Sequence, residues 1–232
     1  MASEEVDIFG SENKKITQEQ IKIQKTFAKW IYSIGFLSIY FDDGNLNSGF
    51  GILLEGGYFL TSSEILRSYG KYPKKIEVKM QDDSANPLIC IANLQIQRLD
   101  NALGLALLKT QGYTNDYCQP TKESFYHKRI YSLQYLGIKE GELLKGDEVY
   151  YPEISSNYSF EVLKNQIITK IVLNQIEGAI YDIDDSKMQK VFLGRPFFDK
   201  NGDFKGMMII NSQYPKPIIV SQKMILNFLK AE

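Results

Sequence analysis

The sequence predicts an all-β protein with one helix near each end. Beyond Gly35, short runs rich in β-branched and aromatic residues alternate with turn signals such as DDGN and EGG. Apolar residues at helical spacing occur before these runs and again at the C-terminal end. Many short strands at this spacing are typical of a β-barrel or a β-sandwich.

The N-terminal region is expected to hold a tail and a helix. Residues 1–16 lack periodicity and are expected to form a flexible tail. Thr17 and Gln20 fit a capping box. Apolar residues then recur at helical spacing: Ile23, Phe27, Trp30, Ile31 and Ile34. We therefore predict a helix over residues 17–34, with Trp30 as a core residue rather than a ligand contact.

The β-rich part divides into two halves of similar length. The stretch TNDYCQPTKESFYHKR is polar and almost without periodicity, so the first half is placed at residues 35–125 and the second at 126–220. Residues 221–232 are predicted to form a helix with Ser221 as its N-cap. Its apolar face would hold Met224, Ile225, Phe228 and Leu229.

Composition narrows the classes of function. The chain has 232 residues, 44% of them hydrophobic, which is enough to bury a substantial core. Lysine and arginine number 27 against 28 acidic residues, and no basic stripe offers a nucleic acid a binding surface. No apolar run reaches the about 18 residues of a membrane-spanning helix. The acidic start MASEEVDIFG lacks the apolar core of a signal peptide and is typical of a chain whose leader has been removed.

The two cysteines, Cys90 and Cys118, leave two alternatives open. They form one disulfide in an oxidising compartment, or they lie as two small buried apolar residues. Their spacing is not that of a zinc site. The single histidine, His127, lies in the segment between the halves, and no recognised frame makes Cys118 a nucleophile with His127 as its base. No cofactor or metal is therefore expected.

Two segments of the first half resemble trypsin-like, and especially HtrA-like, serine proteases. The segment SGFGILLEGGYFLTSSEIL (Ser48–Leu66) is similar to the family's SGFII..DGYILTNAHVV, and Glu64 stands where the family has its histidine. The segment LDNALGLALLK (Leu99–Lys109) is similar to D...DLALLK, and the orienting aspartate falls on Gly104.

The second half carries a further match. VFLGRPFFDKNGDFKGM resembles GNSGGPLFDLNGEVIGI, and the nucleophilic serine falls on Leu193. LLKGDEVYYP is similar to the LKVGDWVLAIG that opens the family's second barrel. The resemblance covers about residues 34–228, and it implies two six-stranded antiparallel β-barrels of the chymotrypsin type.

The same positions predict that the chemistry is lost. Peptide hydrolysis by this family needs a serine nucleophile, a histidine base and an aspartate that orients it, and Leu193, Glu64 and Gly104 can supply none of these. One oxyanion-hole N–H would come from Val191, where the family has glycine and where a β-branched residue resists positive φ. The chain is therefore predicted not to be an enzyme.

Arg195 replaces the bare glycine after Gly194 and raises two alternatives. It pairs with Glu64 across the former cleft, or it points to solvent while Glu64 bonds to local backbone. The acidic cluster Asp182, Asp184 and Asp185 lacks the glycine and distal glutamate of an EF-hand and is expected to be a solvated turn.

The resemblance implies a function based on binding. HtrA-like proteins are commonly periplasmic and oligomeric and often carry PDZ domains, and degenerate relatives occur in envelope machines that include flagellar motor disks. We therefore predict a periplasmic pseudoprotease scaffold that binds other proteins of an envelope assembly and can form homo-oligomers. Two alternatives stay open: a regulator of an active protease of the same fold, and an enzyme with relocated or weak residual hydrolysis.

Overall fold

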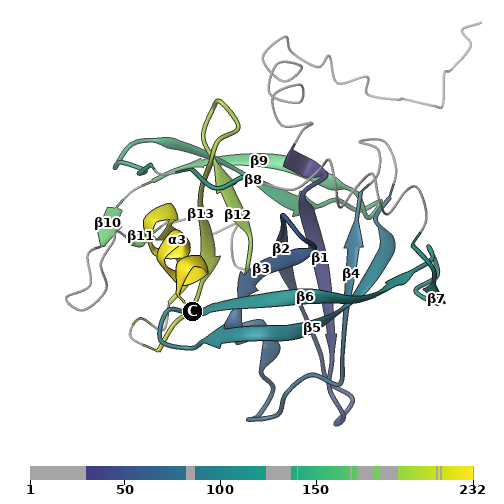
Figure 1. Cartoon of the computed structure of the whole chain (residues 1–232). Coiled ribbons are helices and arrows are strands. Elements are labelled where there is room, and N and C mark those ends of the chain that lie inside the picture. The colour runs from purple at the N-terminus through teal and green to yellow at the C-terminus, as the bar shows by residue number, and fades with distance from the viewer. Residues whose placement is uncertain are drawn as a thin grey trace, which may run out of the picture.

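The computed structural model describes residues 30–81, 87–123, 137–139, 141–167, 169–171, 180–182, 193–212, 214 and 216–231. These residues form two antiparallel β-sheets and one C-terminal helix, as Figure 1 shows. The expected all-β class and the expected C-terminal helix are confirmed. The tail over residues 1–16 and most of the helix predicted at 17–34 lie outside the described residues.

The first sheet closes into a six-stranded barrel. Its strands are β1 (Ile34–Tyr40), β2 (Leu46–Leu54), β3 (Tyr58–Ser62), β4 (Lys75–Met80), β5 (Ile89–Asp100) and β6 (Leu105–Thr114). The order is β3-β2-β1-β4-β5-β6, and pairing of β3 with β6 closes the ring. The short strand β7 (Pro120–Thr121) adds to β6, and the 3-10 helix η1 (Ser63–Leu66) follows β3. Leu37, Ile39 and Val78 exemplify the apolar residues of its core.

The second sheet is not closed among the described residues. It contains β8 (Glu148–Ile154), β9 (Phe160–Gln166), β10 (Thr169–Ile171), β11 (Ile180–Asp182), β12 (Pro196–Phe198), β13 (Phe204–Ile209) and β14 (Ile218–Ser221). Their order is β10-β11-β14-β13-β12-β8-β9. The expectation of a second closed barrel is therefore not confirmed. β9 and β10 follow one another in the chain but lie at opposite edges of the described sheet, where β9 pairs with β8 and β10 with β11.

The N-terminal helix is also corrected at its end. Of the described residues 30–34, only Trp30 and Ile31 are helical. The Ser33 N–H then closes a turn by donating to the Trp30 carbonyl at 2.9 Å. Ile34 is the first residue of β1 and pairs with Ile52, so the demands of the barrel override the helical spacing. Trp30 stacks on Phe198 with ring centroids 3.9 Å apart, which confirms it as a core residue.

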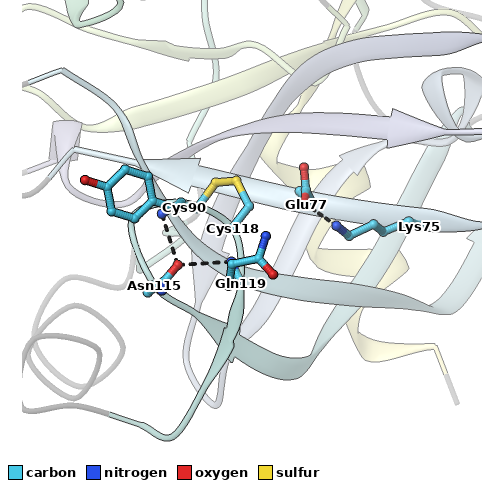
Figure 2. The surroundings of a disulfide bond; sticks show 7 residues. Lys75, Glu77, Cys90, Asn115, Cys118 and Gln119 are labelled. Atoms are coloured by element: carbon cyan, nitrogen blue, oxygen red, sulfur yellow. Dashed lines mark hydrogen bonds and ion pairs between the residues drawn. A yellow bond between two sulfur atoms is a disulfide. The ribbon is translucent and has the colours of Figure 1, made fainter.

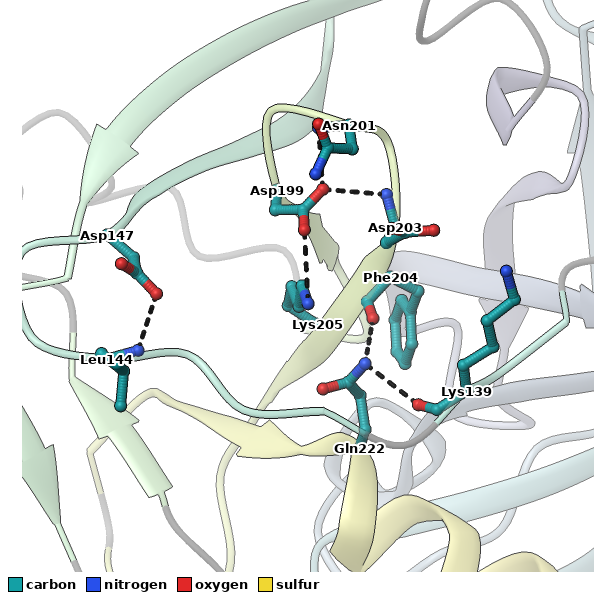
Figure 3. Close-up of polar contacts among 9 residues, drawn as sticks. All are labelled: Lys139, Leu144, Asp147, Asp199, Asn201, Asp203, Phe204, Lys205 and Gln222. Carbon is teal, nitrogen blue, oxygen red and sulfur yellow. Dashed lines mark hydrogen bonds and ion pairs between the residues drawn. The ribbon is translucent and has the colours of Figure 1, made fainter.

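The C-terminal helix α3 (Gln222–Lys230) begins as the sequence predicts. The Ser221 hydroxyl accepts a hydrogen bond from the Met224 N–H at 3.4 Å. Met224, Ile225 and Phe228 are buried against the second sheet. The buried Gln222 amide donates to the carbonyls of Phe204 and Lys139 (Figure 3). These bonds join β13 and the segment that contains Lys139 to the start of the helix.

Arg98 on β5 holds the other end of this helix against the first barrel. Its guanidinium donates to the carbonyls of Phe228 and Ala231, and it lies over the Phe228 ring, 4.3 Å from the centroid. Carbonyls at a helix C-terminus have no partner within the helix and attract a cation. The C-terminal end of α3 is consequently held at β5 of the first barrel.

We expect Arg98→Ala to lower the free energy of unfolding by about 1–2 kcal/mol, because it removes charge-assisted hydrogen bonds to carbonyls and a stacking contact. Denaturant titration measures the change. Arg67→Ala, an exposed cation, is the control and should stay within about 0.5 kcal/mol of the native chain. Equal stability of the two variants would contradict a role of Arg98 in docking the helix.

Candidate functional site

Glu64, at the position of the general base, lies in the 3-10 helix after β3. The Ser62 hydroxyl caps this turn by accepting from the Glu64 N–H at 3.4 Å, and the Glu64 carbonyl accepts from the Arg67 N–H. The Glu64 side chain is exposed, whereas Ile65 and Leu66 are buried in the barrel core. The turn is therefore anchored by its apolar residues, and the carboxylate faces solvent.

Gly104, at the position of the orienting aspartate, lies beside this turn. Its carbonyl accepts a hydrogen bond from the Ser63 N–H at 2.9 Å, so the structure brings positions 64 and 104 together. Gly104 has φ +78°, and a Cβ atom there would lie 2.4 Å from the Ile210 carbonyl oxygen. A side chain at this position meets both an unfavourable backbone conformation and a fixed backbone oxygen. Position 104 therefore holds no carboxylate and has no room for one in this conformation.

Leu193, at the position of the nucleophile, is turned into the protein. Its side chain is 7% exposed and belongs to the same apolar cluster as Ile65 and Leu66. Its carbonyl accepts from the Phe50 N–H at 2.8 Å. A Cβ on Gly49 would lie 2.6 Å from that carbonyl oxygen and 2.8 Å from Ile65, so glycine is needed where the three segments meet. The three positions are assembled, but they present no hydroxyl or thiol nucleophile and no imidazole base.

The residues that follow Leu193 are hydrogen-bonded to β13 and packed closely against β2. Gly194 has φ +81°, and a Cβ there would lie 2.0 Å from the Phe50 carbonyl oxygen. Its N–H donates to the Met208 carbonyl at 2.7 Å, and the Met208 N–H donates to the Arg195 carbonyl at 2.8 Å. Val191, the expected oxyanion-hole position, lies outside the described residues.

Arg195 is buried between the two halves, and both alternatives drawn from the sequence are corrected. Its side chain is 1% exposed, and its Nη2 donates to the Glu153 carboxylate on β8 at 2.9 Å. The guanidinium carbon lies 5.2 Å from the Phe50 ring centroid on β2 and 5.4 Å from that of Tyr151 on β8. Arg195 thus neither pairs with the exposed Glu64 nor points to solvent, because aromatic rings from both halves enclose it.

Burial lowers the pKa of the Arg195 guanidinium below its usual value, and the Glu153 carboxylate opposes this shift. Arginine nevertheless remains protonated in proteins, so the pair is ionic. Breaking such a pair leaves a charge poorly compensated. The sequence prediction missed Glu153. An acidic residue within the otherwise apolar run VYYPEI is the signal that could have identified it.

Several solved structures share this architecture. The Rv3671c protease from M. tuberculosis, in its active form, matches with a TM-score of 0.60 and 12% identity over 90% of this chain and 84% of that one. The serine endoprotease from Yersinia pestis matches with a TM-score of 0.60 and 15% identity over 92% of this chain and 66% of that one. The MamO protease domain from Magnetospirillum magneticum matches with a TM-score of 0.54 and 14% identity over 88% and 98%.

This chain has the trypsin-like protease fold. The similarity is one of structure, since no protein-family model matches the sequence and no curated protein matches it either. The resemblance of the three segments to HtrA-like proteases thus agrees with the three-dimensional arrangement. The trypsin-like fold is retained here with Glu64, Gly104 and Leu193 at the positions where the resemblance places the triad.

The turn after β12 is closed by hydrogen bonds to the Asp199 side chain. The Asp199 carboxylate accepts from the N–H groups of Asn201 and Asp203 at 2.8 and 3.1 Å, and Lys205 lies 3.3 Å from its other oxygen (Figure 3). Gly202 has φ +81°, which suits glycine in this tight turn. The matched residues after Arg195 therefore build a hairpin.

The two cysteines form a disulfide in this trypsin-like fold. Cys90 on β5 is bonded to Cys118 in the β6–β7 turn, with Cα atoms 5.1 Å apart. In Figure 2 the bond lies beside Asn115 and Gln119, where the Asn115 side chain accepts from the Gln119 N–H at 3.0 Å. This decides between the two alternatives that the sequence left open, and it leaves Cys118 no free thiol.

Metal-ligand clusters and membrane-spanning helices are absent from the described part of the trypsin-like fold. Within it, no three histidine, cysteine, aspartate or glutamate residues are grouped so that they could ligate a metal ion. No helix among the described residues has the length and apolar character needed to cross a membrane. His127, Asp184 and Asp185 lie outside the described residues, and Asp182 ends β11.

Proposed function

We propose that this chain is a catalytically inactive protein of the trypsin-like fold that serves as a periplasmic scaffold and binds other proteins. The observation that carries the proposal is the burial of Leu193 in the core at the nucleophile position. A hydrocarbon side chain cannot attack a carbonyl, and the exposed Glu64 is no imidazole base. Function then depends on surfaces of the fold.

The surroundings of Arg195 support the same conclusion. Arg195 occupies the junction between the halves, where it pairs with Glu153 and lies between two aromatic rings. Structural use of a charged residue beside the former nucleophile favours loss of catalysis over relocated chemistry. The Cys90–Cys118 bond supports an oxidising compartment, because disulfides persist there and are rare in reducing cytosol.

Hydrolysis assays on the purified chain test this proposal. We expect no cleavage of fluorescently labelled casein above the buffer rate and no covalent labelling by a fluorophosphonate, with an active trypsin as the positive control. Cleavage that disappears in Glu64→Gln would contradict the proposal and favour weak residual hydrolysis. Glu64 is exposed and makes no ion pair in the described structure, so this variant should fold as the native chain does.

Restoring the triad is expected to fail. The triple change Glu64→His, Gly104→Asp and Leu193→Ser should give no measurable casein hydrolysis. The Cβ atom that aspartate adds at position 104 would lie 2.4 Å from the Ile210 carbonyl oxygen at a left-handed backbone position, so the loop must shift before the carboxylate can reach a histidine.

Gly104→Asp alone is the informative control for that experiment. Its free energy of unfolding should fall by about 2 kcal/mol as a result of the backbone conformation and the close contact. A stable triple variant that cleaves casein would show that the site is one set of side chains away from activity, and would overturn this prediction.

A further inference from the structure

Left-handed backbone occurs at three non-glycine residues of the described structure: Tyr69, Cys118 and Tyr158, with φ of 47°, 61° and 59°. Each lies in a turn that carries a strongly exposed tyrosine, with Tyr69 93% exposed, Tyr117 85% and Tyr158 71%. Glycine adopts this conformation without the steric cost that a tyrosine incurs. Rings so exposed contribute little to the stability of the fold, so burial does not explain why tyrosine occupies these positions.

The turns that carry Tyr117 and Tyr158 are both rigidly braced. The Asn115 side chain accepts from the N–H groups of Tyr117 and Gln119, each at 3.0 Å. In the other turn the Ser155 hydroxyl lies 2.9 Å from the Ser159 hydroxyl, and the Tyr158 N–H donates to the Ser155 carbonyl at 3.1 Å. Aromatic side chains on ordered turns lose little conformational entropy when a partner covers them.

These two turns are fastened to the same short segment before and within β5. The Leu88 N–H donates to the Tyr158 carbonyl at 2.7 Å, and Cys90, two residues on, is disulfide-bonded to Cys118. The path between the Cα atoms of Tyr158 and Tyr117 along these links is at most about 22 Å. A standard interface covers about 800 Å² on each partner, so the two turns lie close enough together to share one footprint.

The described chain segments that form and follow the two turns carry more acidic than basic residues. Residues 115–123 and 155–161 contain Asp116, Glu123 and Glu161 against the single cation Lys122. All four are exposed. A partner with basic residues around an apolar centre would match this surface, because complementary charge at an interface favours encounter and register.

We propose that the paired-tyrosine surface, made of the turns 115–119 and 155–159, binds one protein whose facing surface is apolar at its centre and basic at its rim. The proposal rests on the proposed binding function and assigns the face that performs it. The Cys90–Cys118 bond then has a second consequence, since it holds the Tyr117 turn in register with the Tyr158 turn.

Tyr69 provides a matched control within the same chain. It has left-handed backbone as Tyr158 does and is still more exposed, but its turn is attached to the opposite end of β4. The Lys74 N–H there donates to the Tyr40 carbonyl at 2.8 Å, whereas the segment that leads to Leu88 follows Met80. Substitutions at Tyr69 should therefore affect backbone strain in the same way without touching the paired-tyrosine surface.

Site-specific photocrosslinking in the source cells tests the proposal. Tyr117→p-benzoylphenylalanine and Tyr158→p-benzoylphenylalanine should each crosslink to the same protein, identified by mass spectrometry, and Tyr69→p-benzoylphenylalanine should not. Adding Tyr158→Gly should reduce the crosslink from position 117 at least tenfold, while Tyr69→Gly leaves it unchanged. Both glycine variants should unfold at the same denaturant concentration as the native chain or a higher one.

Three outcomes would overturn the proposal. Positions 117 and 158 capture different proteins or none, position 69 captures the same protein, or Tyr158→Gly leaves the crosslink intact. Asp116→Lys with Glu161→Lys tests the basic rim and should also reduce the crosslink at least tenfold; an unchanged yield would contradict a basic partner. Hydrolysis by the purified chain is measured separately, so a failure of this surface is distinguishable from a failure of the proposed loss of catalysis.

Discussion

Replacing Arg195 by alanine is expected to lower the free energy of unfolding by about 3–5 kcal/mol. The guanidinium lies buried between Phe50 of the first barrel and Tyr151 of the second sheet and pairs with Glu153 at 2.9 Å. Alanine removes the ion pair, the contacts with both rings and the packing of the arginine stem. The loss should appear in denaturant titration as a lower midpoint with little change in slope.

Two variants separate charge from packing at this site. Arg195→Met keeps an unbranched side chain between the rings and removes only the charge, so it should lose less stability than alanine does. The Glu153 side chain is 25% exposed and can then meet water, which limits the cost of leaving it without the arginine. Equal stability of Arg195→Ala and the native chain would mean that the junction between the halves does not depend on this contact.

Removing the disulfide is expected to cost about 3–4 kcal/mol. The bond joins residues 28 positions apart, and closing a loop of that length restricts the unfolded chain. The double variant Cys90→Ala and Cys118→Ala should therefore unfold at a lower denaturant concentration than the oxidised native chain. Each single variant should lose about as much as the double, because either one abolishes the bond.

Reduction of the native chain provides the matching control. Treatment with a reductant should lower its stability by about the same amount and should leave the double variant unchanged. Free thiols detected in the chain as purified from an oxidising compartment would contradict the bond. A double variant as stable as the oxidised native chain would contradict its energetic role.

Local patterns predicted several features because their causes are local. Ser221 caps α3 through a bond to a residue three positions away, and Asp199 closes its hairpin through bonds within four residues. Strand alternation predicted the first half, which closes as a barrel. Helical spacing, in contrast, gave the wrong prediction at Ile34, because pairing of this residue with Ile52 places it in a strand.

The candidate site shows the same division. The residue types at positions 64, 104 and 193 are a matter of sequence alone, and they suffice to predict a site without a nucleophile or an imidazole base. The partner of Arg195 is not local: Glu153 lies 42 residues away, on a strand brought alongside by pairing of β8 with β12. Charge complementarity favoured Glu64 equally, and only the packing of the two halves discriminates between the two carboxylates.

The residue order of this chain is thus sufficient for the all-β class, the terminal cap and the residue types at positions 64, 104 and 193, because each follows from side-chain chemistry or from contacts a few residues long. The strand order of the second sheet, the bond between Cys90 and Cys118 and the burial of Arg195 depend on strand registers across tens of residues. Those registers follow from the simultaneous packing of both halves, which sequence spacing does not encode locally.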